Sequence, residues 1–418
     1  MACLSTFLYG FLRPQQDVKR TPLSCLTVVR CANGRDMANK NLSKAKDVKN
    51  DEFYTQYDDI QKEVNAYLEY DADVFRGKTI LLPCDDPEKS NFTKFFAQNF
   101  ERFGLEKLVS TSYAPEAKAK KYGGDMSLYS YAQEHGEAAP ENERGRIYVL
   151  ERGAKRKGRL DIGALNWEYL KGDGDFRSEE VSALRDEADF IVTNPPFSLF
   201  REFMSWVTVG KKSFLVIGNM NAVTYKEVFP LIKANKMWLG ATGSGSDMVF
   251  GVPSGAKVDP KDREKAAKLG YVGDYTRLGN SCWYSNIEHG RRHQPLRLMT
   301  KAENIKHSKH KEIKEVGYRS YDNYDAIEVP FVDAIPSDFS GVMGVPKSFL
   351  DKYCPEQFEI VGCAEGDSGK ELGLKPFDRK LKKLNPSLRD GQLYYFEDGV
   401  PVKPFARILI RHKKAKAK

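Results

Sequence analysis

The sequence predicts an α/β protein with a mostly parallel β-sheet flanked by helices. From residue 51 onwards, amphipathic segments with helical spacing alternate with short, apolar, β-branched segments. This alternation is typical of a sheet that carries helices on both faces. The apolar segment 188–193 runs directly into Asn194 and two prolines, and two consecutive prolines end a strand because they lack backbone donors. After about residue 290 the alternation loosens into basic sequence rich in Pro and Tyr.

The predicted elements follow in a regular order. A helix over 58–75 precedes a strand over 78–83, and a second helix over 91–104 ends at Gly104. The last predicted strand, 281–290, is expected in an antiparallel pair at the edge of the sheet. The other predicted strands are 106–113, 145–151, 188–193, 212–223 and 236–240, with a helix over 199–210. Because open sheets of this class bind ligands at the carboxyl ends of parallel strands, the turns after these strands are the candidate sites.

The composition predicts two folded regions behind an extension. A chain of 418 residues is long enough for two cores. We expect residues 1–50 to be a disordered or dispensable extension, with 1–36 lying upstream of an ordinary start at Met37, and we place a domain boundary near residue 290. No apolar run approaches the ~20 residues that cross a bilayer. The seven cysteines include no CxxC pair, which indicates no metal site and fits a reducing, cytoplasmic setting.

Positive charge is concentrated in three segments. The formal net charge is +8, and the segment 401–418 holds seven Lys or Arg and no acid. The segments 152–159 and 291–314 are also strongly basic. Such clusters suit a polyanion, because each neutralised phosphate releases counterions. Arg291 and Arg292 are candidate contacts by charge alone, and a solvated surface is the competing interpretation.

The turn Asn194-Pro195-Pro196-Phe197 is the most unusual strand end. The prolines stiffen the chain and direct the Pro195 carbonyl away from the sheet. An amide, a fixed carbonyl and an aromatic face are together suited to holding a planar base that carries an amino group. The alternative is a turn that merely ends the strand and packs a Phe.

A second candidate turn follows the 78–83 strand. Its sequence Cys-Asp-Asp-Pro-Glu-Lys-Ser-Asn, residues 84–91, places Asp85, Asp86, Ser90 and Asn91 at a helix start. Carboxylates repel phosphate but suit an ammonium group or a ribose hydroxyl, and the turn lacks the glycines of a dinucleotide site. A cluster that only caps the helix is the alternative.

A third turn contains Asp175 and Phe176. An acceptor beside an aromatic face suits an adenine ring, which would be held through its amino group and its π surface. A plain Gly-Asp turn with a Phe in the core is the competing interpretation.

Taken together, these segments resemble the EcoRI-type adenine-specific (N6) DNA methyltransferases, which are class I S-adenosylmethionine-dependent enzymes. Asn194 to Phe197 match the [DNS]-P-P-[YFW] motif, and Asp175-Phe176 resembles the acidic-aromatic pair that clamps adenine. The resemblance covers the chain from about residue 51 to the C-terminus. Its narrower carriers are the segments 51–60, 84–96, 172–178, 193–203, 283–289 and 344–362.

The resemblance implies a Rossmann-like catalytic domain over 51–290 and a basic target-recognition region over 291–418. It implies methyl transfer from S-adenosylmethionine to the N6 atom of an adenine flipped out of duplex DNA, as in restriction-modification or in phage and orphan DNA modification. Asn194, Pro195, Pro196 and Phe197 would be catalytic; Asp85, Asp86, Ser90, Asn91, Asp175 and Phe176 would bind the cofactor; Arg291 and Arg292 would contact DNA. We expect a monomer without a metal ion, paired in function with a cognate restriction endonuclease.

The sequence departs from most class I methyltransferases at two points. Cys84-Asp85-Asp86-Pro87 replaces the glycine-rich turn after the first strand, as the EcoRI-type resemblance implies. The ribose-binding acid expected at the end of the next strand is not evident in 106–113.

Two other functions compete with this interpretation. The first is an RNA or protein amide methyltransferase, since turns of the Asn-Pro-Pro-Phe type also serve guanine and glutamine amines. A catalytically idle DNA-binding protein could keep the same fold. The intact turn at Asn194 and the presence of Asp175 argue against the idle protein.

Overall fold

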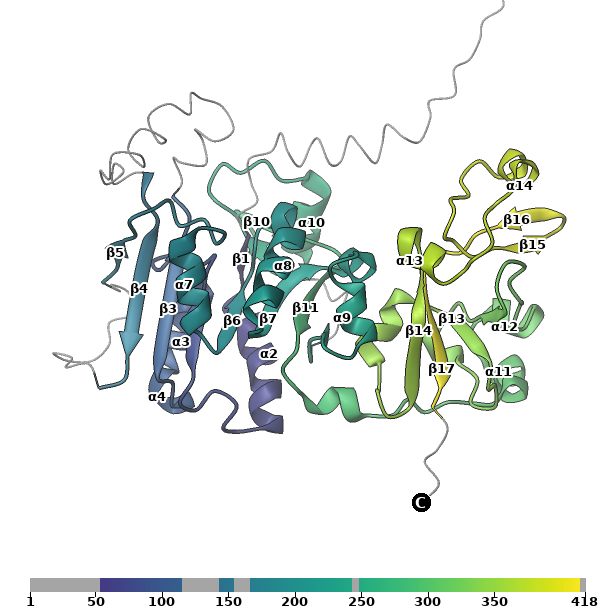
Figure 1. The fold of residues 1–418 in the computed structure, drawn as a ribbon, viewed down its shortest axis with the longest axis horizontal. Helices are drawn as coiled ribbons and strands as arrows, with labels where there is room; N and C mark the ends of the chain where they lie inside the picture. The colour runs from purple at the N-terminus through teal and green to yellow at the C-terminus, as the bar shows by residue number, and fades with distance from the viewer. Residues whose placement is uncertain (1–52, 115–142, 154–165, 243–247, 414–418) are drawn as a thin grey trace, which may run out of the picture. The chain divides into compact units, whose positions relative to one another are not determined.

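The computed structural model describes residues 53–114, 143–153, 166–242 and 248–413. Figure 1 shows the resulting arrangement of helices and strands. The extension predicted over 1–50 lies outside the described residues, as do most of the basic segment 152–159 and the last residues of the chain. No helix in the described ranges is long and apolar enough to cross a membrane.

A sheet of eight strands forms the centre of the first half of the chain, in the order β5-β4-β3-β2-β6-β7-β11-β8. Its strands are β2 (Thr79–Leu82), β3 (Lys107–Ser112), β4 (Arg146–Glu151), β5 (Glu168–Tyr169), β6 (Phe190–Thr193), β7 (Ser213–Asn219), β8 (Trp238–Leu239) and β11 (Ser281–Ser285). Strands β3, β2, β6 and β7 run parallel to one another. Their carboxyl ends therefore lie along one edge of the sheet.

The prediction of a mostly parallel sheet is only partly correct. Strands β4 and β5 are antiparallel neighbours on one side of the parallel core, and β11 and β8 are antiparallel neighbours on the other. Antiparallel strands need no helical crossover, so the sequence alternation that indicates a sheet does not reveal the direction of its outer strands. The antiparallel edge pair predicted for the last strand is confirmed, because β11 pairs antiparallel with the edge strand β8.

Helices cover both faces of this sheet, as predicted. Alternate residues of β6 enter different cores: Ile191 packs with Phe203 of α8, and Val192 packs with Phe92 of α3. All four residues of β6 are buried, which matches a strand without a solvent-facing side. The covering helices are α2 (Tyr57–Tyr70) and α3 (Asn91–Gln98) on one face and α7 (Glu179–Glu187) and α8 (Phe200–Gly210) on the other.

Two predicted helices are shorter than the sequence pattern indicated. Helix α2 ends at Tyr70 because Asp71 is extended, with φ −140° and ψ 104°. The helix predicted over 91–104 is interrupted at Asn99 and continues as α4 (Phe100–Phe103). Gly104 ends it in the left-handed region at φ 66°, which glycine adopts without steric cost.

A small three-stranded sheet brings the beginning of the described chain close to the central sheet. Strand β1 (Tyr54–Thr55) pairs with β9 (Val249–Gly251), which also pairs with β10 (Tyr275–Arg277). Helix α10 (Pro260–Lys268) lies between β9 and β10 in the chain. Phe53, directly before β1, packs against the apolar cluster that contains Phe250.

The second half of the chain forms a four-stranded sheet in the order β12-β13-β17-β14. Its strands are β12 (Ala326–Glu328), β13 (Val342–Pro346), β14 (Phe358–Ala364) and β17 (Arg407–His412). Val345 and Ile408 of this sheet belong to the same apolar cluster as Ile191 of β6. One continuous core therefore joins the two sheets across the expected boundary near residue 290.

Helices α9 (Phe229–Lys233), α11 (Lys301–His307) and α12 (Lys311–Glu315) lie in the chain between β7 and β12.

A buried ion pair joins β12 to β17. The Arg407 guanidinium donates to both carboxylate oxygens of Glu328 at 2.5–3.1 Å, and the Tyr321 hydroxyl donates to the same carboxylate. The side chains of Arg407 and Glu328 are 9% and 4% exposed. Removing one partner would leave a buried charge uncompensated, which typically costs about 3–5 kcal/mol.

We therefore predict that Arg407→Met lowers the free energy of unfolding by about 3–5 kcal/mol, measured by urea denaturation. The double variant Arg407→Met/Glu328→Gln should regain a large part of the loss, because Gln carries no charge and still accepts from Tyr321. A single variant as stable as the parent, or a double variant no better than the single one, would contradict the prediction.

Candidate active site

Three turns with unusual chemistry meet at the carboxyl edge of the parallel strands. The turn after β2 and the turn after β6 are joined directly, because the Thr193 hydroxyl donates to Asp85 Oδ2 at 2.6 Å. The turn at Asp173 joins the end of β3, because Ala114 N–H donates to the Asp173 carbonyl at 2.8 Å. The structure thus brings together the three turns that the sequence singled out.

Asp85 is the common partner of these elements. Its carboxylate accepts from the hydroxyls of Ser90 and Thr193, both at 2.6 Å. Its carbonyl accepts from the Ser110 hydroxyl at 2.6 Å, and its N–H donates to the Thr111 carbonyl at 2.9 Å. Ser90 is also the N-cap of α3. One residue, 5% exposed, therefore connects the ends of β2, β3 and β6 with the start of α3.

The environment of Asp85 favours its neutral form. Burial raises the pKa of this carboxyl to about 7, against the lowering effect of the hydrogen bonds from Ser90 and Thr193. The nearby Asp86 carboxylate adds to the increase. The carboxyl group is consequently set to change its charge near neutral pH.

Asp86 and Asn91 lie closer to the surface than Asp85 and Ser90. Asp86 Oδ1 accepts from the backbone N–H groups of Glu88 and Lys89, at 2.9 and 3.1 Å. The Asn91 side chain donates to the Thr55 carbonyl at 2.8 Å and so ties α3 to β1. Both side chains are partly exposed.

The turn containing Asp175 packs tightly against β3. Gly174 has φ +78°, and a Cβ atom there would lie 2.2 Å from the Ser112 carbonyl oxygen. Only glycine fits both the backbone conformation and the close approach. The Asp175 carboxylate accepts from Arg177 Nε at 2.9 Å and from Arg177 Nη2 at 2.7 Å.

Phe176 does not present the aromatic face that the sequence led us to expect beside Asp175. Its side chain is 4% exposed and packs edge-on against Phe203 and Trp206 of α8, with ring centroids 5.2 and 5.6 Å away. Apolar contacts with α8 hold the ring in the core, and its contact with the cofactor stays a prediction. Phe176 thus packs the turn that contains Asp175 against α8.

The amide of Asn194 is fixed at one end only. Its Nδ2 donates to the Phe53 carbonyl at 2.8 Å, which leaves Oδ1 pointing away from that contact. Oδ1 is buried and has no hydrogen-bond partner among the described residues. A buried acceptor without a donor typically costs about 1–3 kcal/mol. Such a cost is understandable where a ligand supplies the missing donor.

Three phenylalanines surround this turn. Phe197 stacks against Phe53 with ring centroids 5.8 Å apart and an interplanar angle of 30°. Phe250 of β9 meets both rings edge-on, at 6.0 Å from Phe53 and 6.5 Å from Phe197. The side chains of Phe53 and Phe197 are partly exposed, so the cluster forms an aromatic wall beside the free Asn194 oxygen.

Comparison with known proteins agrees with this geometry. The model of the family described as "Adenine-specific methyltransferase EcoRI" matches residues 41–413. The type II methyltransferase M.EcoRI of Escherichia coli is 38% identical over 84% of this chain and 98% of its own length. The type II methyltransferase M.MpnI of Mycoplasma pneumoniae is 34% identical over 77% of this chain and 85% of its own. No solved structure is significantly similar.

The chain belongs to the EcoRI-type adenine-specific methyltransferases. It is an enzyme that methylates adenine in DNA at specific sites. The resemblance inferred from the sequence is confirmed, and the competing interpretations as an amide methyltransferase or an idle protein do not agree with this membership.

Arg291 and Arg292, which the sequence offered as DNA contacts, are occupied within this methyltransferase. Arg291 donates to the Ala241 carbonyl at 2.8 Å and to the Asp351 carboxylate at 2.6 Å. Arg292 is 3% exposed, donates to Glu288 at 2.8 Å, and lies over the Trp238 ring at 3.4 Å from its centroid. Both guanidinium groups hold the fold together, and direct contact of either one with DNA stays a prediction.

Sequence reasoning missed three residues at this site. Thr193 stands next to the recognised turn and could have been found as a polar residue at the end of a buried strand. Phe53 and Phe250 lie far from Asn194 in the chain, and their sequence surroundings carry no sign that they meet it. Pairing of β1 with β9 brings them there.

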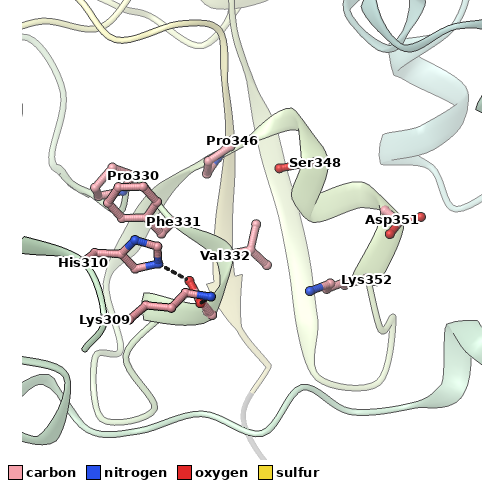
Figure 2. A pocket seen from close by; sticks show the side chains of 10 residues that line it. Lys309, His310, Pro330, Phe331, Val332, Pro346, Ser348, Asp351 and Lys352 are labelled. Atoms are coloured by element: carbon pink, nitrogen blue, oxygen red, sulfur yellow. Dashed lines mark hydrogen bonds and ion pairs between the residues drawn. The ribbon is translucent and has the colours of Figure 1, made fainter. Parts of the chain in front are cut away.

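A hollow on the C-terminal sheet is lined by none of the residues of these three turns. Figure 2 shows its lining, with the His310 ring beside Phe331 and hydrogen-bonded to Asp333. Asp333 also accepts from Lys309 at 2.8 Å, and Asp351 accepts from Arg291. Both carboxylates of the hollow are thus paired, Asp333 with residues of the hollow itself and Asp351 with Arg291 outside its lining.

The raised pKa of Asp85 predicts a pH dependence of stability. Folding raises this pKa from 3.8 to about 7, so the stability that the carboxyl contributes is fully present below about pH 4 and is lost as the pH rises through 7. Relative to Asp85→Asn, the parent should therefore lose free energy of unfolding between about pH 4 and 7. Urea denaturation at half-unit pH intervals measures this, and parallel curves for the two proteins would refute it.

Proposed function

We propose that this enzyme transfers a methyl group from S-adenosylmethionine to the N6 atom of an adenine that is flipped from duplex DNA into the turn after β6. The observation that carries the proposal is the buried, unpartnered Oδ1 atom of Asn194. The adenine amino group supplies the donor that this oxygen lacks. The hydrogen bond from Nδ2 to the Phe53 carbonyl sets the orientation of the amide before the base arrives.

The Pro195 carbonyl is the second acceptor in this proposal. The Pro196 carbonyl accepts from Leu199 N–H at 3.0 Å and is used by the short helix η2 (Phe197–Leu199). The preceding carbonyl, that of Pro195, is held in a rigid segment because proline fixes φ on either side of it. Two acceptors, one from Asn194 and one from Pro195, match the two N–H bonds of an adenine amino group.

These acceptors would act on a weak nucleophile. The lone pair of the adenine amino nitrogen is conjugated with the ring, and hydrogen bonds to both N–H groups draw it towards the methyl donor. Positive charge that develops on this nitrogen is stabilised by oxygens already in place. Flipping the base costs a few kcal/mol in lost stacking, and stacking on Phe197 offsets about 1–3 kcal/mol of it.

The acidic edge of the sheet fits S-adenosylmethionine. When bound, this cofactor supplies an electrophilic methyl group on a cationic sulfonium, and it also carries an ammonium group. Asp86, Asn91 and Asp175 have partly exposed side chains and are proposed to hold it. Asp85 and Ser90 are buried and would position the turn. On this basis we assign residues 51–290 to a class I, Rossmann-like catalytic region.

Residues 291–418 are proposed to recognise the DNA target. This part of the chain contains the C-terminal sheet and many exposed Lys and Arg residues. Cations on a surface next to the catalytic edge would bind backbone phosphates, while neighbouring side chains read base edges. A restriction endonuclease with the same target would be a partner in function.

The activity is tested first by expressing the protein in a methylation-deficient host and mapping N6-methyladenine by single-molecule sequencing. We expect modification at one position of a defined sequence. This experiment also supplies the target duplex for the variants below. Absence of N6-methyladenine from the host DNA would contradict the proposal.

We predict that Asn194→Ala lowers the single-turnover rate of methyl transfer by about 10²–10³-fold, because one placed acceptor is lost. Binding of S-adenosylmethionine, measured by calorimetry, should stay close to that of the parent. Methylation at the parental rate would show that the turn is only structural.

Phe197→Ala should act differently, because it removes the surface on which the extruded base stacks. We predict weaker base capture as well as slower transfer, with 2-aminopurine fluorescence at the target position reporting the flipped state. Phe197→Tyr serves as the control, since it keeps an aromatic face and should retain most of the activity. Equal flipping in the Ala variant and the parent would remove Phe197 from this role.

A further inference from the structure

Residues 365–406 leave the C-terminal sheet and return to it at a single point. Ala364, the last residue of β14, is paired with Arg407, the first residue of β17. The intervening segment contains α13 (Gly366–Glu371), α14 (Arg379–Leu384), β15 (Tyr395–Glu397) and β16 (Val400–Val402). Figure 1 shows α14, β15 and β16 as one projection beyond β14. We call residues 365–406 the excursion.

The excursion is fixed to the sheet by specific packing. Leu393 and Tyr395 share an apolar cluster with Leu409 of β17. A Cβ atom on Gly369 would lie 1.8 Å from the Gly391 carbonyl oxygen, so α13 is pressed against the later loop. The amide of Asn323 donates to the Gln392 carbonyl at 2.9 Å. These contacts describe an ordered unit that is held in one position.

The excursion begins on the edge that adjoins the active site. Pro346 at the end of β13 and Ala364 at the end of β14 are both paired with Arg407 of β17, which lies between them, so both strands end at the same end of the sheet. Lys347 follows Pro346 and donates to the Asn221 side chain at 2.6 Å. Asn221 lies in the short helix η3 (Met220–Thr224) directly after β7, and β7 is the neighbour of β6, which ends one residue before Asn194. This edge of the C-terminal sheet is therefore joined to the catalytic edge of the central sheet.

The outer surface of the excursion combines cations with exposed apolar side chains. Arg379, Lys380 and Lys383 of α14 are exposed, whereas Lys382 is paired with Asp390 at 3.0 Å. Asn385, directly after α14, donates to the Pro401 carbonyl at 2.9 Å and holds the helix on the β15–β16 hairpin. Phe405 follows this hairpin in the chain, and its side chain is 89% exposed.

Phe405 is the most exposed large apolar side chain in the described part of the chain. Its neighbours Lys403 and Pro404 place it in a short, stiff connection between β16 and β17. Leu384, at the end of the basic helix, is 57% exposed. Proteins that bind duplex DNA also combine Arg and Lys contacts with apolar side chains, Phe among them, that insert at base steps.

We propose that the excursion is a DNA-binding module, in which Arg379, Lys380 and Lys383 contact phosphates of the duplex beside the target adenine and Phe405 lies against the same duplex. The proposal rests on DNA as the substrate, and not on which residues bind the cofactor or the flipped base. Its position on the edge joined to the active site would lengthen the DNA surface that the enzyme covers. Charge complementarity selects DNA over an apolar protein partner, because three of the six residues of α14 are exposed cations without an acidic partner among the described residues.

Salt dependence of DNA binding tests the three cations. The full-length variant Arg379→Gln/Lys380→Gln/Lys383→Gln is compared with the parent by fluorescence anisotropy on a 40-base-pair duplex at 50–200 mM salt. Each phosphate contact contributes about 0.9 to the slope of log Kd against log salt concentration, so the slope should fall by about 2 to 3. An unchanged slope and unchanged Kd would overturn the proposal.

A matched control removes three cations from the opposite edge of the central sheet. Arg76 and Lys78 precede β2, and Lys211 precedes β7, so Arg76→Gln/Lys78→Gln/Lys211→Gln changes the net charge equally without touching the excursion. This variant should keep the parental slope. A loss as large as in the α14 variant would show a nonspecific charge effect and overturn the proposal. Cofactor binding and transfer at saturating DNA should persist in both variants, which separates this test from that of Asn194.

Phe405→Ala tests the aromatic contact. The side chain is 89% exposed, so its removal should leave the unfolding curve unchanged. We expect Kd for the duplex to rise about fivefold or more, because the contact would bury apolar surface of the ring, with no change in the salt slope. Parental affinity would remove Phe405 from the interface. Sedimentation that shows a dimer in the parent and a monomer in Phe405→Ala would overturn the proposal in favour of a second copy of the chain.

Discussion

The active edge of this enzyme depends on one buried carboxyl group. Asp85 receives hydroxyl hydrogen bonds from Ser90 and Thr193 at 2.6 Å and is bonded through its backbone to β3. The turn after β2 and the turn after β6 therefore cannot move independently. Because burial raises the pKa of Asp85 to about 7, the charge at this junction is sensitive to a nearby cation, and a bound sulfonium or ammonium group would favour the ionised form. The residue that fixes the geometry would then also respond to the cofactor.

The proposed chemistry needs little beyond oriented acceptors. Providing them lowers the stability of the turn, because one buried acceptor has no hydrogen-bond partner among the described residues. Asn194 keeps a buried oxygen unpaired, although its nitrogen is held by the Phe53 carbonyl. A fully satisfied amide would make a more stable turn and a poorer site, because the base would first have to displace an internal donor. The stiff prolines reduce the freedom that binding would otherwise remove. Stability and function thus make opposite demands on the same four residues.

The C-terminal sheet is attached to this edge by contacts that a linear pattern does not reveal. Arg291 bridges the chain after β8 and the Asp351 carboxylate, Lys347 reaches Asn221, and one apolar cluster contains both Ile191 and Val345. The C-terminal region, which we propose recognises DNA, is thereby held in a fixed relation to the turn proposed to bind the base. Such rigidity suits an enzyme that must place one chosen adenine, since small displacements at the reacting atoms reduce the rate strongly.

The sequence by itself determined the α/β class, the helices on both faces, the strand before Asn194 and the family, because apolar periodicity, proline chemistry and a motif of adjacent residues are local properties. Three features were decided only by the tertiary structure. Phe176 packs in the core against α8, Arg291 and Arg292 are paired with Asp351 and Glu288, and Phe53 reaches Asn194 from 141 positions away in the chain. A residue's type and neighbours limit what it can do, but burial and partner are set by segments distant in sequence. For a buried ring or a paired guanidinium, those distant contacts decide the role.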